Sequence, residues 1–126
     1  MATTAPAGVD LSVVRLVKAL RKYCPTDMPV KITVKDMVSL AGQLERNGHS
    51  HYELNVDAGT NYVIVLPCGT VYAQRDTLIH EWAHAMVWRE SKLEHGPRWG
   101  LAYAYAYRVG IEKWRPKKKF SLANLT

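Results

Sequence analysis

Apolar residues near the start of the chain recur at the spacing of one helix face. Asp10 comes just before them and is a suitable N-cap residue, and the pair Cys24-Pro25 disfavours further helix. We therefore expect a first helix from Asp10 to about Tyr23. Its apolar side follows the i, i+3, i+4, i+7 pattern, at Val13, Leu16, Val17 and Leu20.

A period of two replaces the helical spacing in the middle of the chain. Residues 30–34 alternate clearly, and residues 49–56 and 61–66 also have strand character. The last two segments are separated by Asp57-Ala58-Gly59-Thr60, which is typical of a hairpin loop. Residues 36–45 fit either strand or helix, and a short helix or irregular turn before the Asn-Gly turn is favoured. The pattern predicts a small three-stranded sheet.

Helical spacing returns in two segments of the second half. The first is expected to start at Asp76 or Thr77, after a connection over residues 68–74. The second is expected from Pro97, a residue suited to the first helical position, to about Lys113. The apolar side of the first segment consists of Leu78, Ile79, Trp82, Ala85 and Met86. That of the second consists of Trp99, Ala102, Tyr103, Ala106 and Val109 or Gly110.

Together these elements predict one α+β domain. Its order is an amino-terminal helix, a three-stranded sheet, a helix packed on that sheet and a closing helix. The 126 residues are enough for one domain with a core and a concave site. We place the domain at residues 10–114, after a flexible leader at 1–9 and before a basic tail at 115–126.

The sequence also indicates the cellular compartment in which the protein is expected. No apolar run approaches the roughly 20 residues needed to span a bilayer, and the first residues lack the basic and apolar blocks of a secretory signal. Cys24 and Cys68 are the only cysteines and have no paired spacing, as is usual for reduced thiols. We therefore expect a cytoplasmic protein that does not bind membranes.

The positive charge is concentrated at the end of the chain. Residues 1–112 contain 12 basic and 11 acidic residues, a net charge of +1, whereas residues 113–126 contain five basic residues and no acid. Aromatic residues are interleaved with these cations, a combination that neutralises phosphates and stacks on bases. A solvated terminus without a partner is the alternative interpretation. The candidate contacts to DNA are Arg115, Lys117, Lys118 and Lys119.

The candidate chemistry lies in His80-Glu81-Trp82-Ala83-His84. On a helix, His80 and His84 are four residues apart and offer two imidazoles to one metal ion. Glu81 lies beside the same face, where a carboxylate can take a proton from a metal-bound water without being a ligand. The alternative interpretation is an ordinary amphipathic helix with polar residues on its exposed side.

A catalytic zinc ion usually takes three protein ligands, so a third is needed. His95 follows His84 by eleven residues, and residues 89–94 are long enough to turn the chain after the first helix. Gly96-Pro97 then favours the start of the next helix, which would face His95 back toward the first. We therefore expect His95 to be the third ligand.

Other residues with ligand chemistry remain as alternatives. Glu94 adjoins His95, and a glutamate is a known third ligand in zinc peptidases. Cys68 precedes the metal helix by a short connection and is a further candidate. His49 and His51 face the same side of a predicted strand, which permits a second metal site. No third ligand is apparent near them, so a half-exposed polar pair is favoured.

The segment His-Glu-Trp-Ala-His-Ala-Met-Val-Trp, followed by His-Gly-Pro-Arg-Trp, resembles the core of the SprT-like metallopeptidases, which include the Spartan proteases of DNA-protein crosslink repair. The resemblance is specific over residues 76–100. It implies a zincin-like fold in which His80, His84 and His95 bind one Zn2+ and Glu81 is the catalytic base. The connection from His84 to His95 is shorter than is usual in the family, and the cysteine-rich zinc ribbon of many members is missing from this sequence.

These observations predict a zinc-dependent endopeptidase that acts on a protein or peptide, near nucleic acid if the basic tail binds DNA. A zinc hydrolase of a non-peptide amide is an alternative, because the same site would serve it. A non-catalytic, zinc-containing module that binds nucleic acid or regulates a partner is another. Candidates for stabilising the oxyanion of a tetrahedral intermediate are Arg98, Tyr103 and Tyr107.

Overall fold

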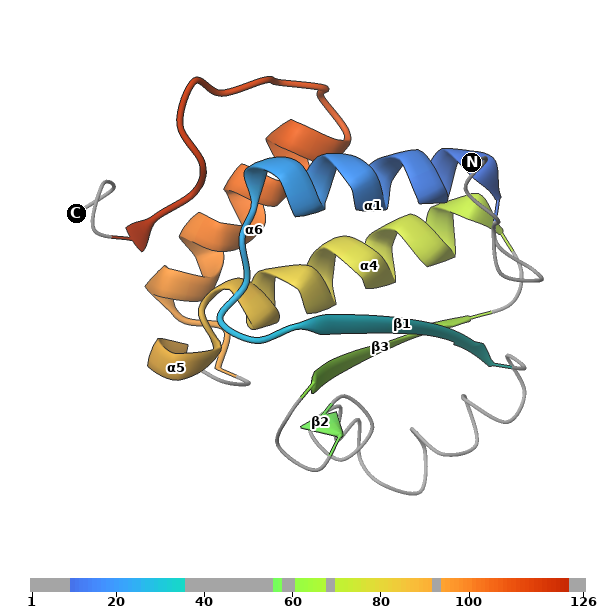
Figure 1. Cartoon of the computed structure of the whole chain (residues 1–126), viewed down its shortest axis with the longest axis horizontal. Helices are drawn as coiled ribbons and strands as arrows, with labels where there is room; N and C mark the ends of the chain where they lie inside the picture. Colours follow the sequence, from blue (N-terminus) through green and yellow to red (C-terminus); the bar gives the residue numbers. More distant parts are fainter. Residues whose placement is uncertain (1–9, 36–55, 58–60, 68–69, 92–93, 123–126) are drawn as a thin grey trace.

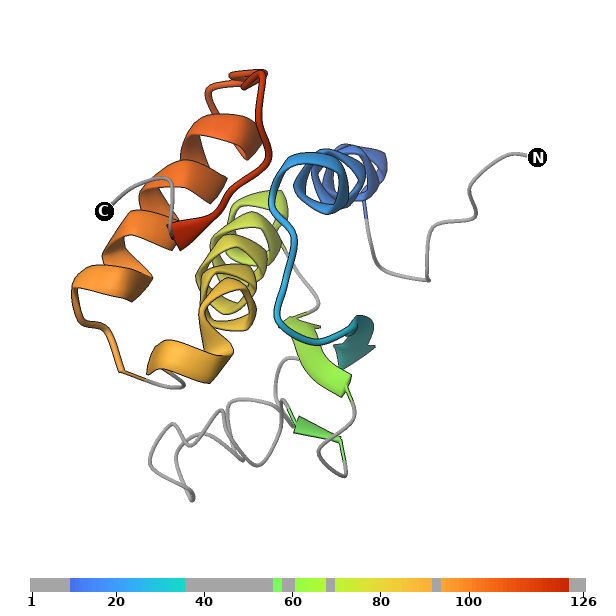
Figure 2. The same ribbon diagram turned by 60° about the vertical axis from the view of Figure 1, so that its left-hand side comes forward.

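A small sheet covers one side of the protein and helices cover the other (Figures 1 and 2). The computed structural model describes residues 10–35, 56–57, 61–67, 70–91 and 94–122. The elements are mixed helix and strand, so the α+β class expected from the sequence is confirmed. The predictions for residues 36–45 and for most of 49–56 fall outside the described residues.

Helix α1 (Leu11–Tyr23) agrees with the first predicted helix. The Asp10 carboxylate accepts a hydrogen bond of 2.8 Å from the backbone N–H of Ser12 and so caps the helix. Hydrogen bonds from Ser12 also lower the pKa of Asp10. The buried side consists of Val13, Val14, Leu16 and Leu20.

The sheet has the order β1-β3-β2, with β3 (Asn61–Pro67) in the centre. Strand β1 (Val30–Lys35) is parallel to β3, with Val30 opposite Tyr62. Strand β2 (Val56–Asp57) is antiparallel to β3, which confirms the predicted hairpin pairing at the residues described. The side chains that alternate along β3 toward the helices are fully buried, at Tyr62, Ile64 and Leu66.

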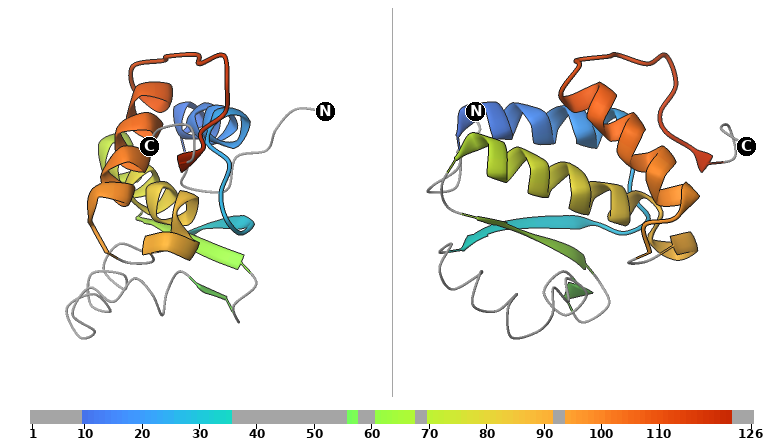
Figure 3. Two further views of the ribbon diagram at one scale, coloured as in Figure 1. Left: turned by 90° about the vertical axis from the view of Figure 1, so that its left-hand side faces the viewer. Right: turned by 180° about the vertical axis from the view of Figure 1, so that it is seen from behind.

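Helix α4 (Val71–Met86) lies between the sheet and the other helices, beside α1 (Figures 1 and 3). It starts earlier than Asp76, so the predicted connection over 68–74 is wrong for residues 71–74. The reason is Thr70, whose hydroxyl accepts a 3.1 Å hydrogen bond from the N–H of Ala73 and caps the helix. The predicted apolar side is confirmed, because Leu78, Ile79, Trp82, Ala85 and Met86 are all buried.

A single turn, α5 (Trp88–Ser91), turns the chain toward α6 (Pro97–Gly110). Pro97 is the first residue of α6, as expected. The helix ends at Gly110, not at Lys113, because Lys113 has a left-handed backbone with φ of 58°. The buried residues of α6 are Ala102, Ala106 and Val109, and they pack against α4 and α1.

The segment 111–122 returns from the end of α6 across the helices (Figure 1). Its Phe120 is buried, and the backbone N–H of Phe120 donates a 2.9 Å hydrogen bond to the carbonyl of Tyr23 at the end of α1. The hydroxyl of Tyr105 donates to the carbonyl of Lys118 at 2.7 Å. The predicted basic tail is therefore attached to the core over residues 115–122. None of the helices described is long and apolar enough to cross a membrane.

Candidate metal centre

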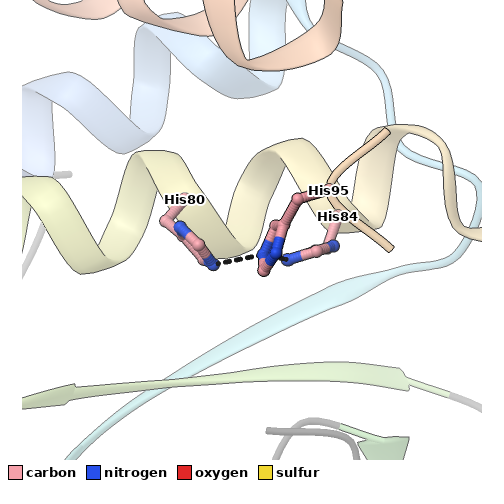
Figure 4. A group of neighbouring side chains, drawn as sticks. All are labelled: His80, His84 and His95. Atoms are coloured by element: carbon pink, nitrogen blue, oxygen red, sulfur yellow. Dashed lines mark hydrogen bonds between the residues drawn. The ribbon is translucent and has the colours of Figure 1, made fainter. Parts of the chain in front are cut away.

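Three histidines converge beside α4 (Figure 4). His80 and His84 lie one turn apart on this helix, and His95 comes from the connection between α5 and α6. The Nε2 atom of His95 is 3.0 Å from that of His84 and 3.2 Å from that of His80. The structure thus brings together the three residues that the sequence predicts as ligands.

The spacing of the His95 nitrogen from those of His80 and His84 fits a small metal ion. Zinc with imidazole ligands at 2.0–2.1 Å in a tetrahedral arrangement has its ligand nitrogens about 3.3 Å apart. The observed Nε2 separations of 3.0 and 3.2 Å are close to that value. His84 is buried, His80 is half-buried and His95 is exposed, so the cluster is covered on one side only. This arrangement can hold a metal ion and leave one side accessible to water or a substrate.

Glu81 is a buried carboxylate next to this cluster. Its side chain is only 3% exposed, and its Oε2 atom is 3.7 Å from Nε2 of His80. Its Oε1 atom accepts a hydrogen bond of 2.7 Å from the hydroxyl of Tyr62. Glu81 and His80 also line a cavity of about 260 Å³ with Asp76 and Thr77. The carboxylate is thus fixed at one oxygen and faces an accessible space near the histidines.

Tyr62 is a residue of the site that sequence reasoning missed. It is the second residue of β3, is fully buried, and packs edge-on against Trp88 with ring centroids 5.4 Å apart. A buried tyrosine hydroxyl normally has a hydrogen-bond partner, and here that partner is Glu81. The alternation of β3 places Tyr62 on the same side as Ile64 and Leu66, which is the signal that points it toward α4.

Trp99, in the first turn of α6, was predicted as a packing residue and covers the histidine cluster. Its ring centroid is 5.1 Å from that of His80, 5.5 Å from that of His84 and 4.7 Å from that of His95. The indole N–H donates a 3.4 Å hydrogen bond to the carbonyl of His80. Trp99 therefore shields one side of the cluster and ties α6 to α4.

The three candidates for oxyanion stabilisation all lie on α6. Arg98 directly precedes Trp99, and Tyr103 and Tyr107 follow it by one and two turns. The ring of Tyr103 contacts that of Trp99 in a tilted arrangement, with centroids 5.0 Å apart, and Tyr107 stacks on Tyr103 at 6.3 Å. These rings form a row that leads from the histidines along the helix. The guanidinium of Arg98 is exposed and lies 3.8 Å from the carboxylate of Glu90. Tyr103 is thus connected to the histidine cluster through one intervening ring, that of Trp99.

The alternative ligands have different positions. Glu94 is exposed, and its backbone carbonyl accepts a 3.3 Å hydrogen bond from the hydroxyl of Ser91. Among the described residues, the group of possible metal donors contains His95 and does not contain Glu94. Cys68, His49 and His51 lie outside the described residues.

Of the four predicted nucleic-acid contacts, Arg115 lies near the end of α1, with its guanidinium 5.6 Å from the ring centre of Tyr23. Arg115 donates hydrogen bonds to the carbonyls of Val109, at 2.9 Å, and Trp114, at 3.1 Å. The side chains of Lys117, Lys118 and Lys119 are exposed.

No family model, curated protein or solved structure matches this chain. The geometry of the site and the sequence pattern are therefore the basis for assigning a function.

Proposed function

We propose that this chain is a zinc-dependent metallopeptidase. In it, His80, His84 and His95 bind one Zn2+, and Glu81 acts as general base. The observation that carries the proposal is the convergence of three imidazole Nε2 atoms beside a buried carboxylate that is not one of the donors. The resemblance of residues 76–100 to the SprT-like peptidases supports the same assignment.

The donor set favours zinc in a catalytic role. Three neutral imidazoles are typical ligands of a catalytic zinc ion, which keeps a further position for water or substrate. His95 is exposed, and the adjoining cavity of about 260 Å³ provides space on this side. When bound, zinc supplies a Lewis acid and a water whose pKa is lowered to about 7.

The residues of the chain then have separate roles. Glu81 accepts a proton at Oε2, because its Oε1 is held by Tyr62, and later returns the proton to the leaving amine nitrogen. Tyr62 fixes the orientation of this carboxylate. Trp99 excludes water from one side of the cluster. A peptide substrate would occupy the cavity lined by Asp76 and Thr77, one turn before the histidines.

A purely structural zinc site has less support. Such sites normally have four protein ligands, whereas the donor group among the described residues has three. A structural site also has no use for a buried carboxylate held by a tyrosine beside the donors. A hydrolase of a non-peptide amide would use the same groups, and the choice of substrate in the assay distinguishes it from a peptidase.

The test compares the parent with Glu81→Gln, His95→Ala and the control Glu94→Ala. Elemental analysis should find one zinc per chain in the parent, Glu81→Gln and Glu94→Ala, and none in His95→Ala. Hydrolysis of an unfolded protein such as casein should fall by about 10²-fold or more in Glu81→Gln, because a general base contributes that much. A parent that holds no stoichiometric metal after zinc is added would contradict the proposal. So would a Glu81→Gln variant as active as the parent.

A further inference from the structure

A second cavity, of about 290 Å³, lies away from the histidines. It is bounded by α1, by the first half of α4 and by the chain that follows α6, three parts of the sequence that meet here. These elements lie together at one side of the helical layer (Figures 1 and 3). The lining contains four cationic residues, and the full set is Ser12, Arg15, Leu16, Ala19, Arg75, Gly110, Lys113 and Arg115.

Nearby carboxylates do not line this cavity. Asp76 follows Arg75 in α4 but lines the cavity beside His80. Glu112 lies 3.8 Å from the guanidinium of Arg108 and forms an ion pair with it. Asp10 caps α1 through Ser12, and Arg15 makes the smallest of the contributions that lower its pKa. The lining of the cavity therefore contains four cations and no acidic residue, and of the nearby carboxylates Asp10 interacts with the charge of Arg15.

Two of the cations are held there by the backbone after α6. The left-handed conformation of Lys113, with φ of 58°, turns the chain back toward α1. This conformation is disfavoured for residues other than glycine, so the surrounding structure must stabilise it. The backbone N–H of Trp114 bonds to the carbonyl of Arg108 at 2.9 Å and closes the turn. Lys113 and Arg115 thus reach the cavity through a defined turn and not through a free terminus.

Arg115 is further fixed on its own side of the cavity. Its Nη1 donates to the carbonyl of Val109 at 2.9 Å, and its guanidinium lies 5.6 Å from the ring centre of Tyr23. A guanidinium held in this way loses little conformational freedom when it binds a ligand. Arg15 and Arg75 come from two helices that are themselves packed together. The fold therefore positions the backbone that carries each of the four cations, and the guanidinium of Arg115 is also held by its own contacts.

We propose that this cavity is a binding site for a phosphate group. Like charges that line one cavity repel one another. An anion that binds between several of them removes most of this repulsion, so its binding is favourable. Guanidinium groups match the oxygens of phosphate with paired hydrogen bonds, and three of the four cations here are arginines. The site is separate from the proposed zinc centre and does not depend on it.

Two sources can provide such a phosphate: a small phosphorylated molecule and the backbone of a nucleic acid. The exposed residues Lys117, Lys118 and Lys119 follow Arg115 on the same segment. These lysines would contact neighbouring phosphates of a nucleic acid and so strengthen its binding. They would not strengthen the binding of a single phosphate group. The two sources therefore differ in how binding depends on these lysines and on salt.

The experiment uses the full chain and two probes, pyrophosphate in calorimetry and a labelled single-stranded DNA oligonucleotide in fluorescence anisotropy. Arg15→Ala is compared with Lys18→Ala, which removes the same charge from an exposed position of α1 outside the cavity. Arg15→Ala should weaken binding by about tenfold and Lys18→Ala by less than about twofold. Arg75→Gln is the second test variant, in case Arg15→Ala lowers the melting temperature.

Each outcome has a defined meaning. Pyrophosphate binding that depends on Arg15 and Arg75, with DNA binding that does not, supports the site for a small phosphorylated ligand. DNA binding that depends on both arginines, and whose salt slope falls by about one in Arg15→Ala, supports the site for a polynucleotide backbone. If neither probe binds the parent, or if Lys18→Ala weakens binding as much as the two arginine variants, the proposal is wrong.

Discussion

At the scale of single residues, the site depends on one hydrogen bond between distant parts of the chain. The hydroxyl of Tyr62 on β3 donates to Oε1 of Glu81 on α4, and both side chains are buried. A buried carboxylate with a fixed orientation presents its second oxygen in a constant direction. Tyr62 is therefore expected to act on the reaction through Glu81, as a positioning residue.

Tyr62→Phe tests this role because it removes only the hydroxyl and keeps the ring against Trp88. Zinc content should stay at one per chain, whereas kcat for peptide hydrolysis should fall by about tenfold, since a misoriented base loses part of its 10²- to 10⁴-fold contribution. Ile64→Val, on the same side of β3, is the control and should change stability by about 1 kcal/mol with little effect on kcat. Equal kcat values for the parent and Tyr62→Phe would remove the positioning role.

The buried thiol of Cys24 is expected to make the free energy of unfolding depend on pH. Burial raises the pKa of its thiol to about 12, well above the ordinary value of about 8.5. The folded state thus holds this proton more tightly than the unfolded state. Its contribution to stability is complete below about pH 8.5 and is lost as the pH rises toward 12. The difference in unfolding free energy between the parent and Cys24→Ala should therefore shrink between about pH 8.5 and 10.5 in urea titrations. A difference that stays constant over this range would contradict the assignment.

The histidines of the site could be predicted from the sequence, whereas the residues that reach the site through tertiary packing could not. The grouping of His80 with His84 follows from helical geometry, and His95 follows from the need for a third donor. Tyr62 and Trp99 reach the site only because β3 and α6 pack against α4, and a single sequence does not specify that packing. Cys24 was recognised as a reduced thiol, but its raised pKa depends on burial that only the fold provides.

At the scale of elements, helix types were predicted well and helix ends were not. The apolar side of α4 was correct from its spacing, but its start was placed too late because Thr70 was not recognised as the cap. The end of α6 was placed three residues too late, because apolar spacing carries no signal for the left-handed residue at Lys113. Periodicity reports which side of a helix is buried, whereas caps and backbone conformation decide where it begins and ends.

Gly110 is at a close approach between helices. A Cβ atom placed there would collide with the side chain of Leu16, which is buried in α1, and would also contact Ile79 of α4. Gly110→Ala should therefore destabilise the protein by about 1–3 kcal/mol, as overpacking does. Gly100→Ala is the matched control in the same helix, because nothing lies within 4 Å of its Cβ position.

The control should behave in the opposite way. Alanine is favoured over glycine in a helix by up to about 1 kcal/mol, so Gly100→Ala should raise the melting temperature while Gly110→Ala lowers it. Thermal unfolding followed by circular dichroism measures both. Shifts of the same sign and size in the two variants would show that Gly110 is not at a constrained contact.

At the scale of the whole molecule, the segment after α6 folds back onto the end of α1 and onto α6. Phe120 is buried against Tyr105, with ring centroids 5.2 Å apart, and its backbone bonds to Tyr23. The sequence suggested a basic tail, because charge dominates this segment and one aromatic residue is a weak signal of burial. The parallel pairing of β1 with β3 was likewise not predicted, because alternation indicates a strand without specifying which strand it pairs with.

Phe120→Ala should lower the free energy of unfolding by about 3 kcal/mol, since it removes a large buried side chain. Phe120→Leu should cost less than about 1.5 kcal/mol because most of the packing is kept. The neighbouring exposed change Lys119→Gln should have an effect within about 0.5 kcal/mol. Urea unfolding measures all three. A Phe120→Ala variant as stable as the parent would show that this segment does not contribute to the core.

The parallel pairing of β1 with β3 is expected to slow the folding of the protein. Val30 is paired with Tyr62, so the central sheet forms only after a long stretch of chain has been closed into a loop. Contacts between residues so far apart in sequence slow folding, to a scale of about milliseconds to seconds for domains rich in them. Tyr62 is also the residue that orients Glu81. The histidines of α4, in contrast, are neighbours as soon as that helix forms. Two of the three candidate metal donors are therefore brought together by local helix formation, whereas Glu81 meets Tyr62 only once β3 packs against α4.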